Sequence, residues 1–297
     1  MSGAAALPRA TPLVNPFAPF DPALQAALSA NVQLALAEDV GDGDRTGLLV
    51  PTDESVTARV LVREAAVLCG APWFEAVMQA LDPSIRIDWR YAEGARMQAD
   101  SIVCMITAPA RALLTAERGA LNFLQLLSGV ASATRRYVDV IEGTRAVILD
   151  TRKTLPGLRL AQKYAVRVGG GQNQRLALYD GILIKENHIA AAGGIPQAMA
   201  AAQALDAGVP IQIEVESLQQ MEAALAAGAV SLLLDNFSLQ AMREAVAQNR
   251  GRALLEASGG VNLDTVRAIA ETGVDRISIG SLTKDVRATD YSLRIIG

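Results

Sequence analysis

Residues 211–235 read IQIEVESLQQMEAALAAGAVSLLLD, and they contain one complete repeat of the fold. Two short apolar runs, 211–216 and 231–235, flank an alanine-rich amphipathic segment over 218–227. Gly228 follows this segment at the position where glycine commonly ends a helix in the left-handed conformation. The stretch therefore predicts a strand, a helix and a second strand, which is the repeat of a parallel sheet or barrel.

The same repeat recurs through the C-terminal half of the chain. Four further strand-like runs lie at 146–150, 182–185, 253–258 and 276–280. Further helical patterns lie at 158–168, 195–207, 239–249 and 263–272. The six runs together predict a parallel βα sheet or barrel.

The N-terminal half is less regular and predicts a smaller α/β domain. Its strand-like runs lie at 56–62, 66–69, 85–89 and 101–106, and its helical patterns at 73–80, 112–127 and 132–141. Trp73 and Trp89 fall in these elements, and we expect both in the core. Residues 1–24 contain five prolines and no continuous apolar segment, so we expect a flexible arm that a partner subunit orders.

Charged and hydroxyl residues stand at the carboxyl ends of the predicted strands. In a βα barrel these ends build the active site. The ends read, in chain order, Asp150-Thr151-Arg152-Lys153, Lys185-Glu186, Glu214-Val215-Glu216, Asp235-Asn236, Ser258-Gly259-Gly260 and Gly280-Ser281. Loops at this edge are often polar because they face water, but that alternative does not explain why the first two ends are cationic and the next two anionic.

A basic stretch over residues 151–188 contains seven Lys or Arg against only Asp180 and Glu186, although the whole chain has a formal charge of −4. Arginine suits carboxylate or phosphate, and lysine provides a mobile point charge. Nucleic-acid binding usually needs a wider basic surface and a high pI, whereas this chain has a pI of about 5.2. The stretch therefore indicates a site for a small polyanion.

Composition excludes several classes of protein. No run of about 18 apolar residues is free of charge, Pro or Gly, so a spanning helix is not expected. The single histidine, His188, rules out a multi-histidine zinc site. His188 follows Lys185 closely, and it either approaches the site or caps the loop through a backbone hydrogen bond. Cys69 and Cys104 lie outside any CxxC and are expected to be reduced, which suits the cytosol.

The strand ends suggest a division of labour. Four cationic residues of the basic stretch form a cationic wall, namely Arg152, Lys153, Arg175 and Lys185. Glu214 and Asp235 follow on the next strands and could hold Mg²⁺ through water, since Mg²⁺ typically uses one or two carboxylates plus substrate phosphates. Glu216 shares a strand face with Glu214, which we favour. The alternative is a buried structural ion pair, for example Lys185 with Glu214.

Glycines at two adjacent strand ends suggest phosphate binding. Ser258–Gly260 precedes a helix with Asn262 as its expected N-cap, and Ile279–Ser281 closes the next strand. Backbone N–H groups at such sites can approach an anion closely. By contrast, Gly169–Gly171 follows a helical pattern and is read as a helix stop.

Several of these motifs together resemble the quinolinate phosphoribosyltransferase family. The motifs are TRKTLPGLRLAQKYAVRVGGG (151–171), LIKENH (183–188), IEVE (213–216), LLLDNF (232–237), LEASGG (255–260) and ISIGSLT (277–283), with Glu38-Asp39, Gly43–Thr46 and Glu117–Gln125 upstream. The resemblance runs from about residue 25 to the C-terminus. It implies an incomplete barrel of about six strands over 129–282, and an N-terminal α/β sandwich over 25–128 that the C-terminal tail, 283–297, joins.

The resemblance also implies the reaction, which transfers phosphoribose from phosphoribosyl pyrophosphate (PRPP) to quinolinate with decarboxylation, and gives nicotinate mononucleotide for NAD biosynthesis. It implies Mg²⁺ with PRPP, no organic cofactor and a homodimer. From the composition above we expect a cytoplasmic location and no nucleic-acid or membrane partner. Quinolinate binding falls on Arg152, Arg175 and Lys185. Lys153, Glu214 and Asp235 match the PRPP and Mg²⁺ side, and the catalytic set is Lys153, Lys185, Glu214 and Asp235.

The remaining substrate-binding residues follow from the same resemblance. Arg118 matches an arginine that the family donates into the neighbouring subunit's site. Gln174 stands where the family usually has histidine, and it can still donate a hydrogen bond to a carboxylate. The rest of the set is Thr151 with the two glycine-containing ends, Ser258, Gly259, Gly260, Ile279, Gly280 and Ser281.

Three other functions remain open from the residues. Lys185 at a strand end could be the nucleophile of a Schiff-base lyase. A related pyrophosphorylase-like enzyme could use another heterocyclic acid, with Gln174 as the mark of that specificity. A non-catalytic barrel could bind phosphorylated ligands, although the presence of Lys153, Lys185, Glu214 and Asp235 favours an enzyme.

Overall fold

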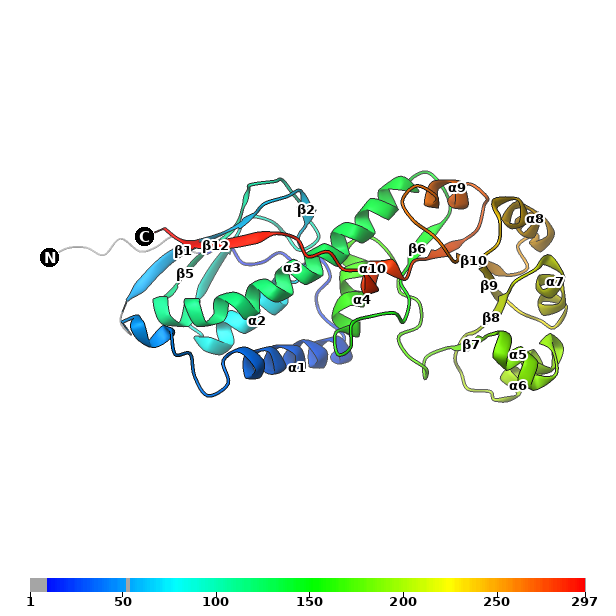
Figure 1. Cartoon of the computed structure of the whole chain (residues 1–297), viewed down its shortest axis with the longest axis horizontal. Helices are drawn as coiled ribbons and strands as arrows, with labels where there is room; N and C mark the ends of the chain where they lie inside the picture. The colour runs from blue at the N-terminus through cyan, green and yellow to red at the C-terminus, as the bar shows by residue number, and fades with distance from the viewer. Residues whose placement is uncertain (1–9, 52–53, 297) are drawn as a thin grey trace. The chain divides into compact units, whose positions relative to one another are not determined.

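A computed structural model describes residues 10–51 and 54–296, which divide into two compact units (Figure 1). Among the described residues, unit 1 comprises those up to Ser132, Leu160–Gly169 and those from Val286 on, and unit 2 comprises Ala133–Arg159 and Gly170–Asp285. The boundaries between the units, after Ser132 and before Val286, lie a few residues beyond the expected ones at 128 and 283. The assignment of Leu160–Gly169 to unit 1 was not expected from the sequence.

Unit 1 contains a four-stranded antiparallel sheet in the order β12-β1-β5-β3. The strands are β1 (Ser55–Val62), β3 (Arg86–Trp89), β5 (Ile102–Pro109) and β12 (Tyr291–Ile295), and a separate pair joins β2 (Ala66–Val67) to β4 (Arg96–Met97). Buried residues alternate along β1, as expected for a sheet with one face against a core. β12 pairs with β1, so the C-terminal tail supplies an edge of the sheet.

The helices of unit 1 are α1 (Pro22–Asp39), α2 (Ala71–Leu81), the first part of α3 (Ala110–Val140) and most of α4 (Arg159–Val168), with a 3₁₀ turn η1 at Gly47–Leu49. Trp73 and Trp89 are buried in this unit, as expected. The sequence predicted two helices over 112–127 and 132–141, and this was wrong. α3 is continuous because Gly129, in its interior, lets the helix pass against the backbone of Arg287.

Part of the expected flexible arm packs on unit 1. The N–H of Thr11 donates to Asp88 at 2.9 Å, and its carbonyl accepts from the N–H of Trp89 at 3.1 Å. The rings of Phe17 and Phe20 contact Tyr164, with ring centroids 6.0 and 5.1 Å apart. The expectation of a loose arm is therefore wrong for residues 10–24, because the phenylalanines between the prolines have a buried partner. Residues 1–9 lie outside the described residues.

Buried Glu93 holds α4 within unit 1. Its carboxylate accepts from the N–H of Gly70 at 2.8 Å and of Ala71 at 3.2 Å, where α2 begins. The Tyr164 hydroxyl, on α4, donates to the same carboxylate at 3.0 Å. Burial raises the pKa of Glu93 to about 7. Residues 151–158, which include Arg152 and Lys153, lead directly into α4. The hydrogen bond of Tyr164 to Glu93 therefore fixes the helix in which this loop ends.

Unit 2 contains six parallel strands in the order β6-β11-β10-β9-β8-β7. They are β6 (Val147–Leu149), β7 (Ile182–Ile184), β8 (Ile211–Val215), β9 (Ser231–Asp235), β10 (Leu254–Ser258) and β11 (Arg276–Ser278). All six predicted strands are present. Each step from β7 to β11 moves one strand in the same direction, and right-handed crossovers then place every helix on one face. Because β6 lies beside β11, the strand order is that of a barrel left open between β6 and β7.

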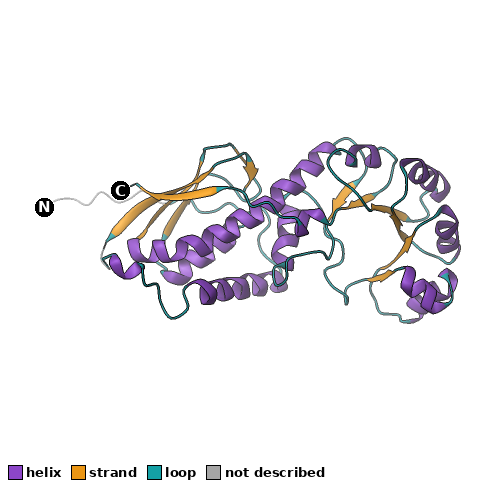
Figure 2. Cartoon of the chain, in the orientation of Figure 1, coloured by secondary structure: helices purple, strands orange, loops and turns teal. Residues whose placement is uncertain are grey.

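Five helices of unit 2 lie along one face of this sheet (Figure 2). They are α5 (Glu186–Ala192), α6 (Ile195–Ala204), α7 (Leu218–Ala226), α8 (Leu239–Asn249) and α9 (Val266–Ala270). The unit also contains the last residues of α3 and the short α10 (Ser281–Lys284), which follows β11. The sequence missed α5 and α10, whose few residues show no clear period. Asn262 accepts from the N–H groups of Asp264 and Thr265, so it caps the turn that precedes α9. In the described part of the chain no helix is long and apolar enough to cross a membrane.

We predict that G129A destabilises the protein by about 3 kcal/mol, because a Cβ at this position would overlap the Arg287 carbonyl. The matched control is G119A on the same helix. A Cβ at Gly119 would lie 3.6 Å from Val77 Cγ1, an ordinary contact, so this variant should be neutral or about 1 kcal/mol more stable. Urea unfolding followed by circular dichroism measures both, and equal midpoints for the two variants would contradict the account of α3.

Candidate functional site

A cavity of about 170 Å³ opens at the carboxyl ends of the unit 2 strands. Eight of the residues singled out from the sequence line it: Thr151, Arg152, Lys153, Gln174, Arg175, Lys185, Glu214 and Ser258. They come from the ends of four strands and from the segment that follows α4. The parallel strand order explains this convergence, because the carboxyl ends of parallel strands meet at one edge of the sheet.

Two arginines in this cavity lie close enough for their charges to repel. Burial lowers the pKa of Arg175, and the positive charge of Arg152 lowers it further. Arg152 Nε is buried and has no hydrogen-bond partner among the described residues. An anion would relieve the repulsion and supply the missing acceptor. This is the arrangement expected of a carboxylate or phosphate site.

Lys185 and Glu214 face each other from neighbouring strand ends, with Nζ 2.9 Å from Oε2. Burial raises the pKa of Glu214, and the negative charge of Asp235 raises it further, although Lys185 acts in the opposite direction. The ion pair anticipated as the structural alternative therefore exists. However, the Lys185 side chain is 46% exposed, so a ligand in the cavity can reach its ammonium group.

Lys153 is held by the ends of β6 and β11. Its N–H donates to the hydroxyl of Thr151 at 3.0 Å, and its carbonyl accepts from the hydroxyl of Thr283 at 2.7 Å. Gly280 approaches the side chain so closely that a Cβ there would lie 3.0 Å from Lys153 Cδ. The absence of a side chain at Gly280 thus gives the lysine stem its room.

The loop that carries Arg175 is tied down at several points. Asp150 accepts from the N–H of Gln174 at 2.9 Å and from the side chain of Asn173 at 2.6 Å. Arg175 itself donates to the carbonyl of Gly181 at 2.8 Å. Arg159 donates to Thr154 and to the carbonyls of Arg152 and Leu176. It therefore joins the loop that carries Arg152 to the loop that carries Arg175.

The remaining predicted residues do not line the cavity. Asp235 ends β9 and accepts from the side chain of Asn236. Gly259, with φ of +101°, lies against Asn236, where any side chain would overlap the asparagine. Ile279 is buried in the core, and its N–H donates to the carbonyl of Leu149. The others are Gly260, Gly280 and Ser281, which follow β10 and β11.

The structure selects one of the two roles considered for His188. Its Nδ1 accepts from the backbone N–H of Lys185 at 3.0 Å, which caps the N-terminus of α5. His188 is exposed and does not line the cavity. Its effect on the site is to fix the backbone of Lys185.

Four cavity residues were missed by the sequence analysis. They are Leu183, Leu233, Glu256 and Ser278. Each lies two residues before a strand-end position already chosen, and alternate residues of a strand face the same side. This period could have found them.

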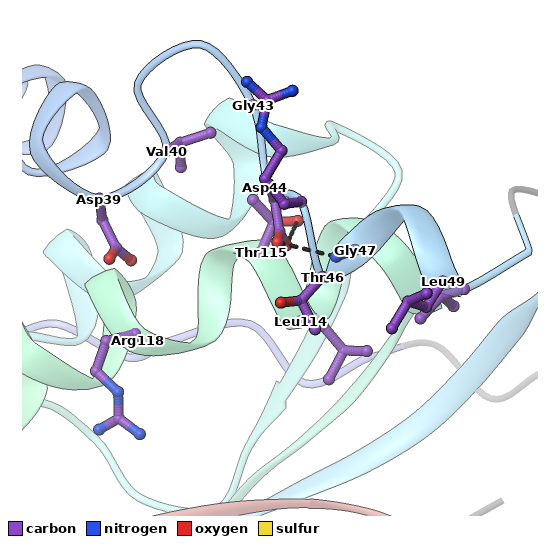
Figure 3. A pocket seen from close by; sticks show the side chains of 12 residues that line it. Asp39, Val40, Gly43, Asp44, Thr46, Gly47, Leu49, Leu114, Thr115 and Arg118 are labelled. Atoms are coloured by element: carbon purple, nitrogen blue, oxygen red, sulfur yellow. Dashed lines mark hydrogen bonds between the residues drawn. The ribbon is translucent and has the colours of Figure 1, made fainter.

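Arg118 lines a different pocket, of about 640 Å³, which belongs to unit 1. It lies on α3 and is exposed, one turn beyond Thr115. The Thr115 hydroxyl donates to Asp44 at 2.8 Å, and Asp44 also accepts from the N–H of Gly47 at 2.9 Å (Figure 3). These hydrogen bonds lower the pKa of Asp44. They hold the loop after α1 against α3, with Asp39 and Arg118 at the side of the pocket away from Leu49.

Fold and cavity thus define an α/β protein with a cation-lined cavity at the open barrel of unit 2. Two family models match the chain: the N-terminal domain of quinolinate phosphoribosyl transferase over residues 44–128, and the C-terminal domain over residues 130–294. The chain therefore belongs to the quinolinate phosphoribosyltransferase family.

Individual relatives agree with this assignment. The nicotinate-nucleotide pyrophosphorylase [carboxylating] of Mycobacterium leprae (strain TN) is 43% identical over 272 residues, which are 88% of this chain and 95% of the relative. A probable nicotinate-nucleotide pyrophosphorylase [carboxylating] of Bacillus subtilis (strain 168) is 38% identical over 87% of this chain and 90% of its own length. The solved structure of the nicotinate-nucleotide pyrophosphorylase from Francisella tularensis is similar with a TM-score of 0.89, at 43% identity, over 91% of this chain and 96% of that one.

We predict that G280A weakens the binding of inorganic diphosphate about tenfold, because a Cβ would lie 3.0 Å from Lys153 Cδ and the lysine stem would have to shift within the cavity. The backbone of Gly280 has φ of −70°, which alanine adopts without strain, so thermal stability should stay unchanged. Titration calorimetry with G119A as the matched glycine control measures the effect. Unchanged diphosphate binding would show that Lys153 does not face this ligand.

Proposed function

We propose that this protein transfers the phosphoribosyl group of PRPP to quinolinate and releases diphosphate and CO₂, which forms nicotinate mononucleotide. The observation that carries the proposal is the pair of mutually repelling guanidinium groups, Arg152 and Arg175, beside Lys185 in one cavity. Quinolinate carries two adjacent carboxylates, and these three cations offer donors to both of them. The Schiff-base alternative for Lys185 is set aside, because the relatives named above are nicotinate-nucleotide pyrophosphorylases.

In this proposal the cations orient the pyridine ring. Arg152, Arg175 and Lys185 hold the carboxylates so that the ring nitrogen faces the anomeric carbon of PRPP, and such positioning lowers the barrier by several kcal/mol. The C–N bond forms as the C–O bond to diphosphate breaks. Lys153 then stabilises the negative charge that grows on the departing diphosphate.

The second half of the reaction needs no organic cofactor. Once ribosylated, the ring nitrogen is cationic and stabilises the electron pair left on the neighbouring carbon when CO₂ departs. A proton then replaces the lost group. This chemistry uses no histidine base, which fits a chain whose one histidine, His188, caps a helix.

Glu214 and Asp235 would hold Mg²⁺ together with PRPP. Burial is the main cause of the raised pKa of Glu214, and the negative charge of Asp235 adds to it, so a divalent cation would relieve the repulsion between the two carboxylates. Over residues 10–51 and 54–296 no three His, Cys, Asp or Glu side chains gather to bind a metal by themselves. Water and diphosphate oxygens would therefore complete the coordination, and the bound ion would supply charge stabilisation for the leaving group.

Arg118 would act on the site of a second subunit in a homodimer. It is an exposed cation in a pocket of unit 1, and Leu48 and Leu49 beside that pocket are 64% and 82% exposed. Exposed apolar side chains next to an unpaired charge suit a surface that a partner covers. We also propose a cytoplasmic location, which suits the free thiols of Cys69 and Cys104.

The proposal is tested by incubating the protein with quinolinate, PRPP and Mg²⁺ and measuring nicotinate mononucleotide and CO₂ together. We expect equal amounts of both products, and a loss of at least about a hundredfold in K153A without a change in melting temperature. Nicotinate in place of quinolinate is the matched substrate control. Turnover of another heterocyclic acid but not of quinolinate would contradict the proposal.

The shared site predicts that two inactive variants complement each other. Mixing R118A with K153A should restore about one quarter of wild-type turnover, because half of the dimers are mixed and one of their two sites then has both residues. Mixing K153A with K185A is the control and should restore none, since both residues lie in the same unit 2 cavity. No recovery from R118A with K153A, in mixed dimers shown to form, would place Arg118 in its own subunit's site.

A further inference from the structure

Three polar side chains below the cationic wall form a closed set of hydrogen bonds. Gln174 Nε2 donates to Gln212 Oε1 at 2.7 Å and to Glu256 Oε2 at 3.1 Å. Gln212 Nε2 donates to the same Glu256 oxygen at 2.9 Å. Glu256 is 1% exposed and Gln212 is 7% exposed, so the bond between them is shielded from water, while the two bonds of Gln174 are partly buried. In such surroundings hydrogen bonds are strong, and losing one partner is costly.

This set is connected to the cationic wall through one backbone group. The N–H of Arg175 donates to Gln174 Oε1 at 2.6 Å. The carbonyl oxygen of the Gln174 amide therefore contacts Arg175, while both of its N–H groups point at Gln212 and Glu256. The expectation that Gln174 donates to a substrate carboxylate does not follow from this geometry, since its donors are directed into the barrel.

The loop that carries Gln174 and Arg175 has a cavity on each side, so hydrogen bonds have to hold it in place. A second cavity, of about 210 Å³, lies toward the amino ends of the strands, and Ser231 and Arg276 mark that end. Gln174, Arg175 and Leu183 line both cavities, whereas Gln212 lines only the second and Glu256 only the first. The three-residue set thus separates the two cavities, and it supports Arg175 where close-packed side chains would normally do so.

We propose that Gln174, Gln212 and Glu256 form a positioning unit that aims Arg175 at the quinolinate carboxylates. The inference rests on the proposed function. Gln174 acts through the Arg175 backbone and is not a substrate ligand, and Gln212 and Glu256 act through Gln174. The amides supply neutral donors to the buried Glu256 carboxylate, so the arrangement of the wall does not require a further cation within the barrel.

Gln212 provides the decisive test because it does not line the quinolinate cavity. In Q212L both hydrogen bonds of Gln212 within the set are lost, so we expect the KM for quinolinate to rise about tenfold, with the KM for PRPP unchanged. Q174L should show the same split, and the double variant Q174L/Q212L should be no worse than Q174L, because residues of one network are not additive. The control is Q172L, whose side chain lines the second cavity without joining the set, and it should behave as wild type.

Q212M, which keeps the length of the side chain, replaces Q212L should the latter fail to fold. An unchanged quinolinate KM in Q212L or Q212M, with a raised one in Q174L, would overturn the inference and make Gln174 a direct ligand. A parallel rise of both KM values with a lower melting temperature would overturn it in favour of a general structural role. Wild-type turnover of quinolinate is measured first, so its absence, which contradicts the proposed function, is distinguished from these outcomes.

Discussion

The repulsion between Arg152 and Arg175 is the constraint around which the site is organised. Two guanidinium groups in a half-buried cavity tend to move apart, and an unfixed loop would let them do so. The structure prevents this with hydrogen bonds: Asp150 and Gly181 hold the Arg175 loop, and Arg159 joins it to the Arg152 loop. Asp180 offsets part of the positive charge of Arg175, but burial and Arg152 still lower the pKa of Arg175, so a ligand anion would be stabilised there.

The open side of the barrel makes this arrangement possible. The parallel order leaves β6 and β7 as edges, and the segment that carries Arg175 lies between them in the chain. Gln172 forms a bridge with Leu149 of β6, so the segment begins by using the free edge of the sheet. A closed barrel would offer no such edge, and its interior would be filled by side chains. The gap in the barrel thus admits the loop whose cations define the site.

The sequence predicted the six strands of unit 2 and most of the cavity because both depend on local patterns. Lys185 and Glu214 could be placed from strand ends alone, since parallel strands bring these ends together. Glu256 lies in the middle of the run LLEAS, so only the alternation of strand faces counted back from Ser258 points to it, and its partners, which come from two other segments, could not be predicted. The continuous α3 was also missed, since the reason that Gly129 stays in a helix is the backbone of Arg287, far along the chain. Arg118 was identified only by family resemblance, because nothing in its local pattern connects it with the barrel.

In unit 2 the cationic side chains lie at the strand ends, and neutral amides surround the carboxylate further inside the barrel. This arrangement explains how a chain of net charge −4 can bind a dianion. At the strand ends the ionic groups are partly exposed, so the charge of Lys185 remains available although Glu214 pairs with it. Below them, Gln174 and Gln212 meet the carboxylate of Glu256 with neutral amides. A lysine or arginine in that inner position would neutralise Glu256, but it would also repel Arg175 from below and weaken the positioning of the wall. Neutral donors satisfy the buried carboxylate without this repulsion, so the charge state of the interior and the geometry of the binding surface are determined by the same three side chains.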